Sequence, residues 1–130
     1  MKAPSRDIGE LLQAETSLGL TMGTNLFANI LPEGVDNVVS VNDYGGMEPG
    51  QYDMRKPSLQ IYVRNNDSEV GYNLLNNIYY FLNEKRNFTI NDSRYIQIRA
   101  KAEIQPLPRD EENRHIWSLN FQIIRTGTNT

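Results

Sequence analysis

The hydrophobic pattern changes its period within residues 57–83, from two residues to three or four. Leu59, Ile61 and Val63 alternate with other positions, which predicts a half-buried strand. Further on, apolar positions at helical spacing define one helix face: Val70, Leu74, Leu75, Ile78 and Leu82. Asn66 stands three residues before Glu69 and is the expected N-cap. The segment therefore predicts a helix that covers the apolar face of a strand.

A second, earlier helix is expected near the start of the chain. Ser5 is its expected N-cap, and Ile8, Leu11 and Leu12 form its apolar stripe. Gly19 is its expected end, because glycine adopts the left-handed conformation at little cost.

Five other segments have the composition or alternation of strands: 26–30, 38–41, 88–90, 95–104 and 115–125. In the fourth segment the residues of the apolar face are Ile96, Ile98, Ala100, Ala102 and Ile104. In the last segment the residues expected to face the core are Trp117, Leu119, Phe121 and Ile123. The element order predicts an α+β fold, a mostly antiparallel sheet with two α-helices packed on one face.

The expected organisation is a single domain over residues 1–130, with long loops at 42–56 and 105–114 and a flexible tail at 126–130. The first loop contains Gly45-Gly46 and Pro49-Gly50, which are residue pairs typical of turns. A loop of that length in a small domain indicates a binding segment. Its large apolar residues are interface candidates: Tyr44, Met47, Tyr52 and Met54.

Composition narrows the function classes. The chain has no Cys, which leaves no disulfide framework and no thiolate metal site. The net charge of −3 is too balanced for tight, nonspecific binding to duplex DNA. The sequence contains no apolar run near the roughly 20 residues of a membrane helix, and its polar beginning is unlike a signal peptide. We therefore expect no membrane partner.

Few residues of the sequence are candidates for catalysis or for binding a metal or cofactor. His115 is the one histidine, and we interpret it as a strand-end side chain rather than a general base, because no nucleophile is arranged near it in sequence. The acidic run Asp110, Glu111 and Glu112 lacks the spacing of a calcium loop and is interpreted as a solvated loop. Gly45-Gly46 lacks both glycine-rich phosphate-loop motifs. We expect no catalytic, cofactor-binding or metal-binding residue.

Aromatic residues of the second helix leave two interpretations open. Tyr72, Tyr79 and Phe81 exceed what one core face can hold, so they either lie over the rim of the core or form a subunit interface. Ile116 and Ile124 fall on the outward face of the last strand and raise the same question. We include Tyr72, Tyr79, Ile116, Ile124 and the acidic run 110–112 among the interface candidates.

The arrangement resembles the tail-terminator and minor-capsid (neck) proteins of long-tailed bacteriophages. The matching features are the Leu31-Pro32 turn before Val38–Val41, the Gly45-Gly46 loop, the strand Pro57–Arg64, and Arg114 before the WSLNF strand. They span nearly the whole chain and are matched by pattern and spacing, since none is a catalytic signature.

The resemblance implies a structural virion protein without enzymatic activity or cofactors, located in the tail-neck region and assembled in the host cytoplasm. Such terminators form a hexameric ring on the head-proximal end of the tail tube. The implied partners are further copies of the chain, the tail tube protein and a head-connector or stopper protein. DNA passes through the lumen without specific binding.

Three other functions compete with the terminator. One is another neck role, as a head-completion or head-closure protein. A second is a nucleic-acid-binding module, which a sheet with two helices can form. The expected outward positions of strand 95–104 do not favour it, because they carry no aromatic pair: Gln97, Arg99, Lys101 and Glu103. The third, a small hydrolase, is remote because no nucleophile–base pair is evident.

Overall fold

The computed structural model describes residues 1–127 of the chain. The helices are α1 (Pro4–Ala14), the short 3-10 helix η1 (Thr16–Leu18) and α2 (Ser68–Leu82). The strands are β1 (Leu26–Ala28), β2 (Val38–Met47), β3 (Lys56–Asn65), β4 (Arg86–Ile90), β5 (Ser93–Ala100), β6 (Gln105–Leu107) and β7 (His115–Gly127). Apart from η1 and β6, which were not predicted, these elements lie where the sequence predicts them, with differences mainly at their ends.

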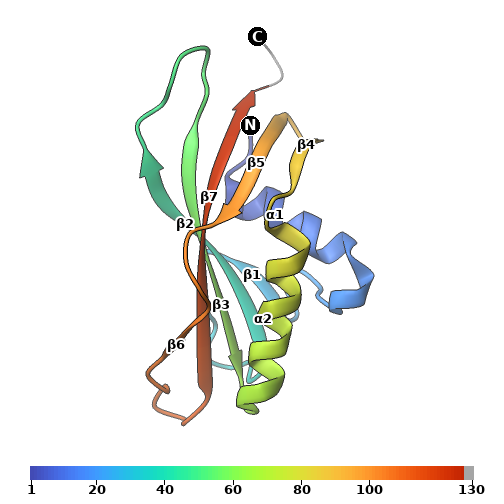
Figure 1. Cartoon of the computed structure of the whole chain (residues 1–130). Coiled ribbons are helices and arrows are strands. Elements are labelled where there is room, and N and C mark those ends of the chain that lie inside the picture. The colour runs from blue at the N-terminus through green and yellow to red at the C-terminus, as the bar shows by residue number, and fades with distance from the viewer. Residues whose placement is uncertain (128–130) are drawn as a thin grey trace.

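All the strands join one sheet in the order β1-β2-β3-β7-β5-β4, and the short β6 also pairs with β7 (Figure 1). Among the strands of residues 1–127, β1 and β2 pair in parallel and the other strand pairs are antiparallel. The long strand β7 pairs with β3 on one side and with β5 and β6 on the other. The sheet and its two α-helices confirm the α+β fold class.

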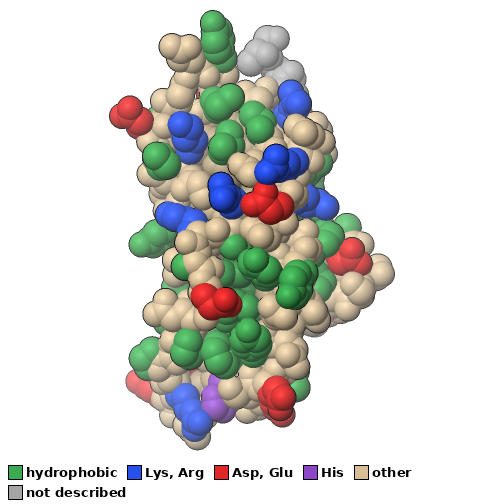
Figure 2. Space-filling view, viewed as in Figure 1, with side chains coloured by type: hydrophobic (Ala, Val, Ile, Leu, Met, Phe, Trp, Pro, Cys, Tyr) green, Lys and Arg blue, Asp and Glu red, His purple; other side chains and the backbone are tan. Residues whose placement is uncertain are grey.

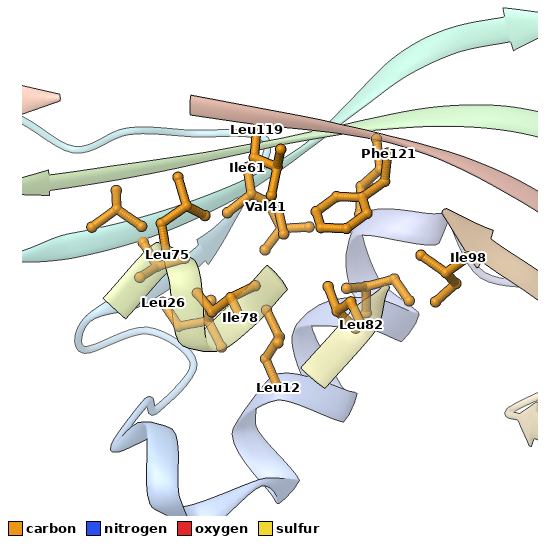
Figure 3. Packing of buried hydrophobic residues seen from close by; sticks show 14 of the residues in the cluster. Leu12, Leu26, Val41, Ile61, Leu75, Ile78, Leu82, Ile98, Leu119 and Phe121 are labelled. Carbon is orange, nitrogen blue, oxygen red and sulfur yellow. The ribbon is translucent and has the colours of Figure 1, made fainter. Parts of the chain in front are cut away.

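The core lies between the helices and one face of the sheet (Figure 3). α2 contacts β3, β7 and β5, and α1 contacts β1, β2 and β3. The residues of β7 that were predicted to face the core are removed from solvent: Leu119, Phe121 and Ile123 are buried, and Trp117 is half-buried. The alternating pattern of β7 therefore predicts its core face correctly.

The predicted helix caps are wrong. Ser5 lies inside α1, whose N-cap is Ala3 without a side-chain hydrogen bond. The N-cap of α2 is Asp67, not Asn66, because the Asp67 carboxylate accepts hydrogen bonds from the main-chain N–H groups of Glu69 and Val70. α1 ends at Ala14, and Gly19, with φ of 68°, ends η1 instead.

One residue of the predicted α2 stripe is misplaced. Val70 is 53 % exposed, whereas Gly71 is buried. A side chain at Gly71 would meet Asn65 Cβ at 3.1 Å and Trp117 Cδ1 at 3.3 Å. The first turn of α2 therefore approaches the sheet through a glycine, and Val70 turns toward solvent.

The predicted strand 95–104 is also corrected. A register shift between Tyr95 and Gln97 changes the alternation, so Tyr95 is buried and Ile96 only half-buried. The strand β5 ends at Ala100, and Ala102 is exposed. A bulge of this kind adds a residue to one strand and reverses the facing of the residues before it.

The loops are shorter than predicted. β2 continues to Met47 and β3 begins at Lys56, so residues 48–55 connect them instead of 42–56. Within 105–114, residues 105–107 form β6. The expected tail 126–130 is partly strand, since β7 ends at Gly127, and residues 128–130 lie outside the described part of the chain.

Candidate assembly surfaces

The β2–β3 hairpin projects beyond the sheet at one end of the molecule (Figure 1). β1 pairs with β2 only as far as Val41, so the projecting part of β2 has β3 as its only paired strand. We call residues 44–56 the arm. It contains four of the interface candidates predicted from sequence: Tyr44 (59 % exposed), Met47 (63 %), Tyr52 (91 %) and Met54 (36 %). The arm thus brings these four residues together on one exposed feature.

The base of the arm is tied to α1 through Asp43. Its carboxylate accepts hydrogen bonds from the main-chain N–H of Ser5 at 3.0 Å, the Ser5 hydroxyl at 2.6 Å and the Asn29 side-chain amide at 2.8 Å. A carboxylate at the first turn of a helix also interacts favourably with the helix dipole. Asp43 therefore supplies from β2 the cap that Ala3 does not provide.

Two glycines shape the arm where its register shifts. Gly45 and Gly46 have φ of 62° and 141°, within the shift between Asp43 and Gly46. A Cβ at Gly46 would lie 2.3 Å from the Lys56 carbonyl oxygen, whereas a Cβ at Gly45 would meet nothing within 4 Å. The two strands of the arm can therefore approach this closely only with glycine at position 46.

We expect Gly46→Ala to disrupt the arm more than Gly45→Ala does. Both substitutions place a side chain at positive φ, at a cost of about 1 kcal/mol or more. Only Gly46→Ala adds a clash with main-chain atoms of β3. Limited proteolysis should cut the arm of Gly46→Ala faster, with Gly45→Ala as the matched control. Equal cleavage rates would show that the close approach at Gly46 does not hold the arm.

A buried polar network fastens α1 to the sheet near the arm. The Tyr95 hydroxyl donates to the Asp7 carboxylate at 2.7 Å, and Arg125 lies 3.4 Å from the same oxygen. Burial, followed by the hydrogen bond to Asp7 and its charge, raises the pKa of Tyr95 far above its ordinary value. The main chain of Arg125 exchanges two hydrogen bonds with that of Arg55 in the arm. The network therefore connects α1, β5 and β7, and β7 connects to the arm.

At the opposite end, two buried arginines hold two loops together. Arg114 donates to the Asp110 carboxylate at 2.8 Å and to the Glu33 carbonyl at 2.8 Å. Arg64 donates to the carbonyls of Pro32 and Val35. Both arginines are at most 4 % exposed. They fix the 31–36 segment against the 108–114 loop.

The acidic run is divided between two environments. Asp110 points inward, and its carboxylate also accepts from the main-chain N–H groups of Glu112 and Arg114. Burial alone would raise the pKa of Asp110, but these bonds and the Arg114 charge outweigh it and hold the pKa below its usual value. Glu111 and Glu112 are exposed. Asp110 therefore orders the loop, while its two neighbours remain available for contacts.

The other apolar candidates are half-buried. Ile116 lines a cavity of about 430 Å³ between the two loops, and Ile124 is half-buried on β7. Tyr72 packs edge-on against Trp117, with ring centroids 5.2 Å apart. Tyr79 packs against the core and accepts a hydrogen bond from Asn83. These contacts fit the interpretation that the aromatic rings lie over the core rim, and their role in an interface stays a prediction.

Sequence reasoning missed two exposed residues on α2. Val70 and Tyr80 are 53 % and 73 % exposed, although Val70 was assigned to the core stripe. For Tyr80 the available signal was its position on the helix, away from the stripe formed by Leu74, Leu75, Ile78 and Leu82.

The family model for bacteriophage tail terminator proteins matches residues 15–126. The chain belongs to this family. It is therefore a structural protein of the phage virion, a tail protein that assembles with other proteins of the particle, and not an enzyme.

A solved structure of the virion of a native gene transfer agent particle contains a chain of similar fold. The TM-score is 0.70 at 13 % sequence identity, and 96 % of each chain is covered. At this identity the match supports the fold alone. The search of curated proteins found no match. Within residues 1–127, no helix is both long and apolar enough to cross a membrane.

Proposed function

We propose that copies of this tail-terminator chain form a closed, hexameric ring on the head-proximal end of the tail tube. The ring stops polymerisation of the tube and joins it to the head connector or stopper protein. DNA passes through the ring lumen without specific binding. Membership of the terminator family over residues 15–126 is the observation that carries this proposal.

The arm supports the ring proposal physically. A closed ring with rotational symmetry uses two different surfaces of each subunit in a head-to-tail contact. The arm offers exposed Tyr and Met side chains, residue types that are enriched in protein interfaces. Its anchoring to α1 through Asp43 holds that surface in a defined position relative to the body of the subunit.

Termination requires the two faces of the ring to differ. One face matches the stacking surface of the tube, and the other does not, so a further tube ring finds no complementary partner. We assign contacts between rings to the exposed carboxylates Glu111 and Glu112 at the end opposite the arm. Complementary charges there would favour the correct register more than they would raise affinity.

The proposal is tested by removing the protein during phage assembly and imaging the tails. Without it, we expect overlong tubes and tails that are not joined to heads. Supplying the wild-type chain should restore tails of normal length, and supplying Thr89→Ala, changed at an exposed β4 residue outside the arm, should restore them equally.

Two other results would contradict the proposal. Normal tails joined to full heads in the absence of the protein would show that it does not terminate the tube. Tails of normal length that fail to join heads would assign it to another neck position, such as head completion or head closure.

A further inference from the structure

The exposed large hydrophobic residues of the described chain concentrate on two surfaces. Within residues 1–127 there are eight of them: Met1, Ile30, Tyr44, Met47, Tyr52, Met54, Val70 and Tyr80. Four belong to the arm and two to α2, while Met1 and Ile30 belong to neither. Single exposed hydrophobic residues are ordinary, but groups of them indicate contact surfaces.

Beyond Glu69 in its first turn, the solvent side of α2 carries no charged residue. Val70, Asn73, Asn77 and Tyr80 recur at three- and four-residue spacing, and all four are exposed; we call them the outer face of α2. No residue from Val70 to Asn83 is charged. The exposed side of a surface helix ordinarily carries charged residues. Depletion of charge together with an exposed tyrosine is instead typical of the centre of a protein interface.

Other surface regions of the molecule, unlike the outer face of α2, carry exposed charged residues. Figure 2 shows hydrophobic side chains over α2 and basic side chains over the neighbouring β4–β5 region. There Arg86 and Arg99 are 59 % and 67 % exposed, and both lie close to Glu84. The end of the molecule opposite the arm exposes the carboxylates of Glu33, Asp36, Glu111 and Glu112. Covering either charged region with the exposed Tyr and Met side chains of the arm would remove charges from water at a large cost.

The arm and the outer face of α2 cannot meet within one chain. The arm projects from the end of the sheet away from α2, which covers β3, β7 and β5 (Figure 1). The base of the arm is held in place by Asp43 and by the main-chain bridge between Arg55 and Arg125. Any contact between the two surfaces is therefore a contact between two copies.

We propose that the outer face of α2 receives the arm of a second copy of this chain. Tyr52 in the 48–55 connection of the arm and Tyr80 on α2 are the central residues of this contact, because they are the two most exposed of the large hydrophobic residues. Each copy then gives its arm to one neighbour and receives an arm from the other. This arrangement rests on the proposed ring and names the two surfaces that build it.

The test uses two variants that each remove one side of the contact. Tyr52→Asp places a charge on the arm and leaves α2 intact, while Tyr80→Asp does the reverse. Thr89→Asp is the matched control, because it adds the same charge at an exposed β4 residue outside both surfaces. Masses are measured for each purified chain at several concentrations, alone and with tail tubes, and circular dichroism verifies the fold.

We expect Tyr52→Asp and Tyr80→Asp each to raise the concentration at which rings form by roughly tenfold or more, the loss typical of a central interface residue. An equal mixture of the two variants should form a dimer and nothing larger, since only one junction, between an intact arm and an intact α2, can form. The Thr89→Asp control should form rings as the wild type does.

Two failures are distinguishable. A wild-type chain that forms rings, with the two variants forming them equally well or with their mixture remaining monomeric, overturns the assignment of these surfaces and leaves the proposed function standing. A wild-type chain that stays monomeric alone and forms no ring on tubes contradicts the proposed function and this inference together.

Discussion

Replacing Asp7 with Ala should lower the free energy of unfolding by about 3–5 kcal/mol, the usual cost of removing one partner of a buried ion pair. Asp7 is fully buried, and its carboxylate accepts hydrogen bonds from Asn91 and Tyr95 and lies 3.4 Å from Arg125. Without that carboxylate, the Arg125 charge and the Tyr95 hydroxyl lose a buried acceptor. Urea unfolding followed by circular dichroism measures the change.

Two further variants distinguish the contribution of the buried Asp7 network from a general weakening of the contacts of α1. Asp43→Ala removes a second carboxylate that contacts α1, but Asp43 is exposed, so a cost of about 1 kcal/mol, typical of a lost helix cap, is expected. The double variant Asp7→Leu with Arg125→Met removes both charges and should be less destabilised than the sum of its single variants. An Asp7→Ala chain as stable as the wild type would show that the network does not stabilise the fold.

This network illustrates what the sequence leaves undetermined. Asp7 and Arg125 are 118 positions apart, and neither stands in a motif that marks it as buried. In the sequence Asp7 is explained equally well as an acidic residue in the first turn of a helix. Only the docking of α1 on the sheet brings the carboxylate beside Tyr95 of β5 and Arg125 of β7. Contacts of this range depend on the assembled fold and have no local pattern.

The periodic elements were predictable because their periods come from burial itself. β7 alternates across a sheet that has the core on one side, so its inward residues could be read directly from the sequence. Where a local backbone change intervenes, the same reasoning failed. The bulge at Tyr95 reversed the facing of the first half of β5, and nothing in its composition marks an extra residue there.

The helix caps failed for a different reason. Ser and Asn are good capping residues, but a residue can cap a helix only where its own backbone is extended and the next residue is helical. α2 begins one residue after the expected position, with Asp67 as its cap. α1 takes its cap from Asp43 on β2, a residue 38 positions from Ser5. A tertiary cap of this kind cannot be recognised before the strand and helix are docked.

The position of the arm was predicted in part. Glycines and a lack of periodicity marked residues 42–56 as a binding loop, and the four apolar residues chosen there lie together on the arm. The pairing of β2 with β3 beyond Asp43 was not predicted. Gly45 and Gly46 are typical of a turn in the sequence, whereas in the structure they shape a register shift within a hairpin. The exposure of Tyr80 was not predicted, because no sequence pattern distinguishes it from Tyr72 and Tyr79 on the same helix.

Phe121→Ala should lower the free energy of unfolding by about 3–5 kcal/mol, because it removes a large, fully buried side chain from the centre of the core. Phe121 lies on β7 opposite Leu59 of β3 and Ala100 of β5. Its ring points into the core (Figure 3). The cavity it leaves would be bounded by three strands that are held in register by their hydrogen bonds, so little collapse is expected. Thermal or urea unfolding measures the loss.

The matched control for this core prediction is Ile124→Ala, three positions further along the same strand. Ile124 is half-buried and lies on the opposite face of β7, so its truncation should cost only about 1 kcal/mol. The difference between the two variants measures how strongly β7 distinguishes its core face from its outer face. If both variants lost similar stability, the outer face of β7 would have to be packed as tightly as the core, and the assignment of residues to the two faces of the sheet would be wrong.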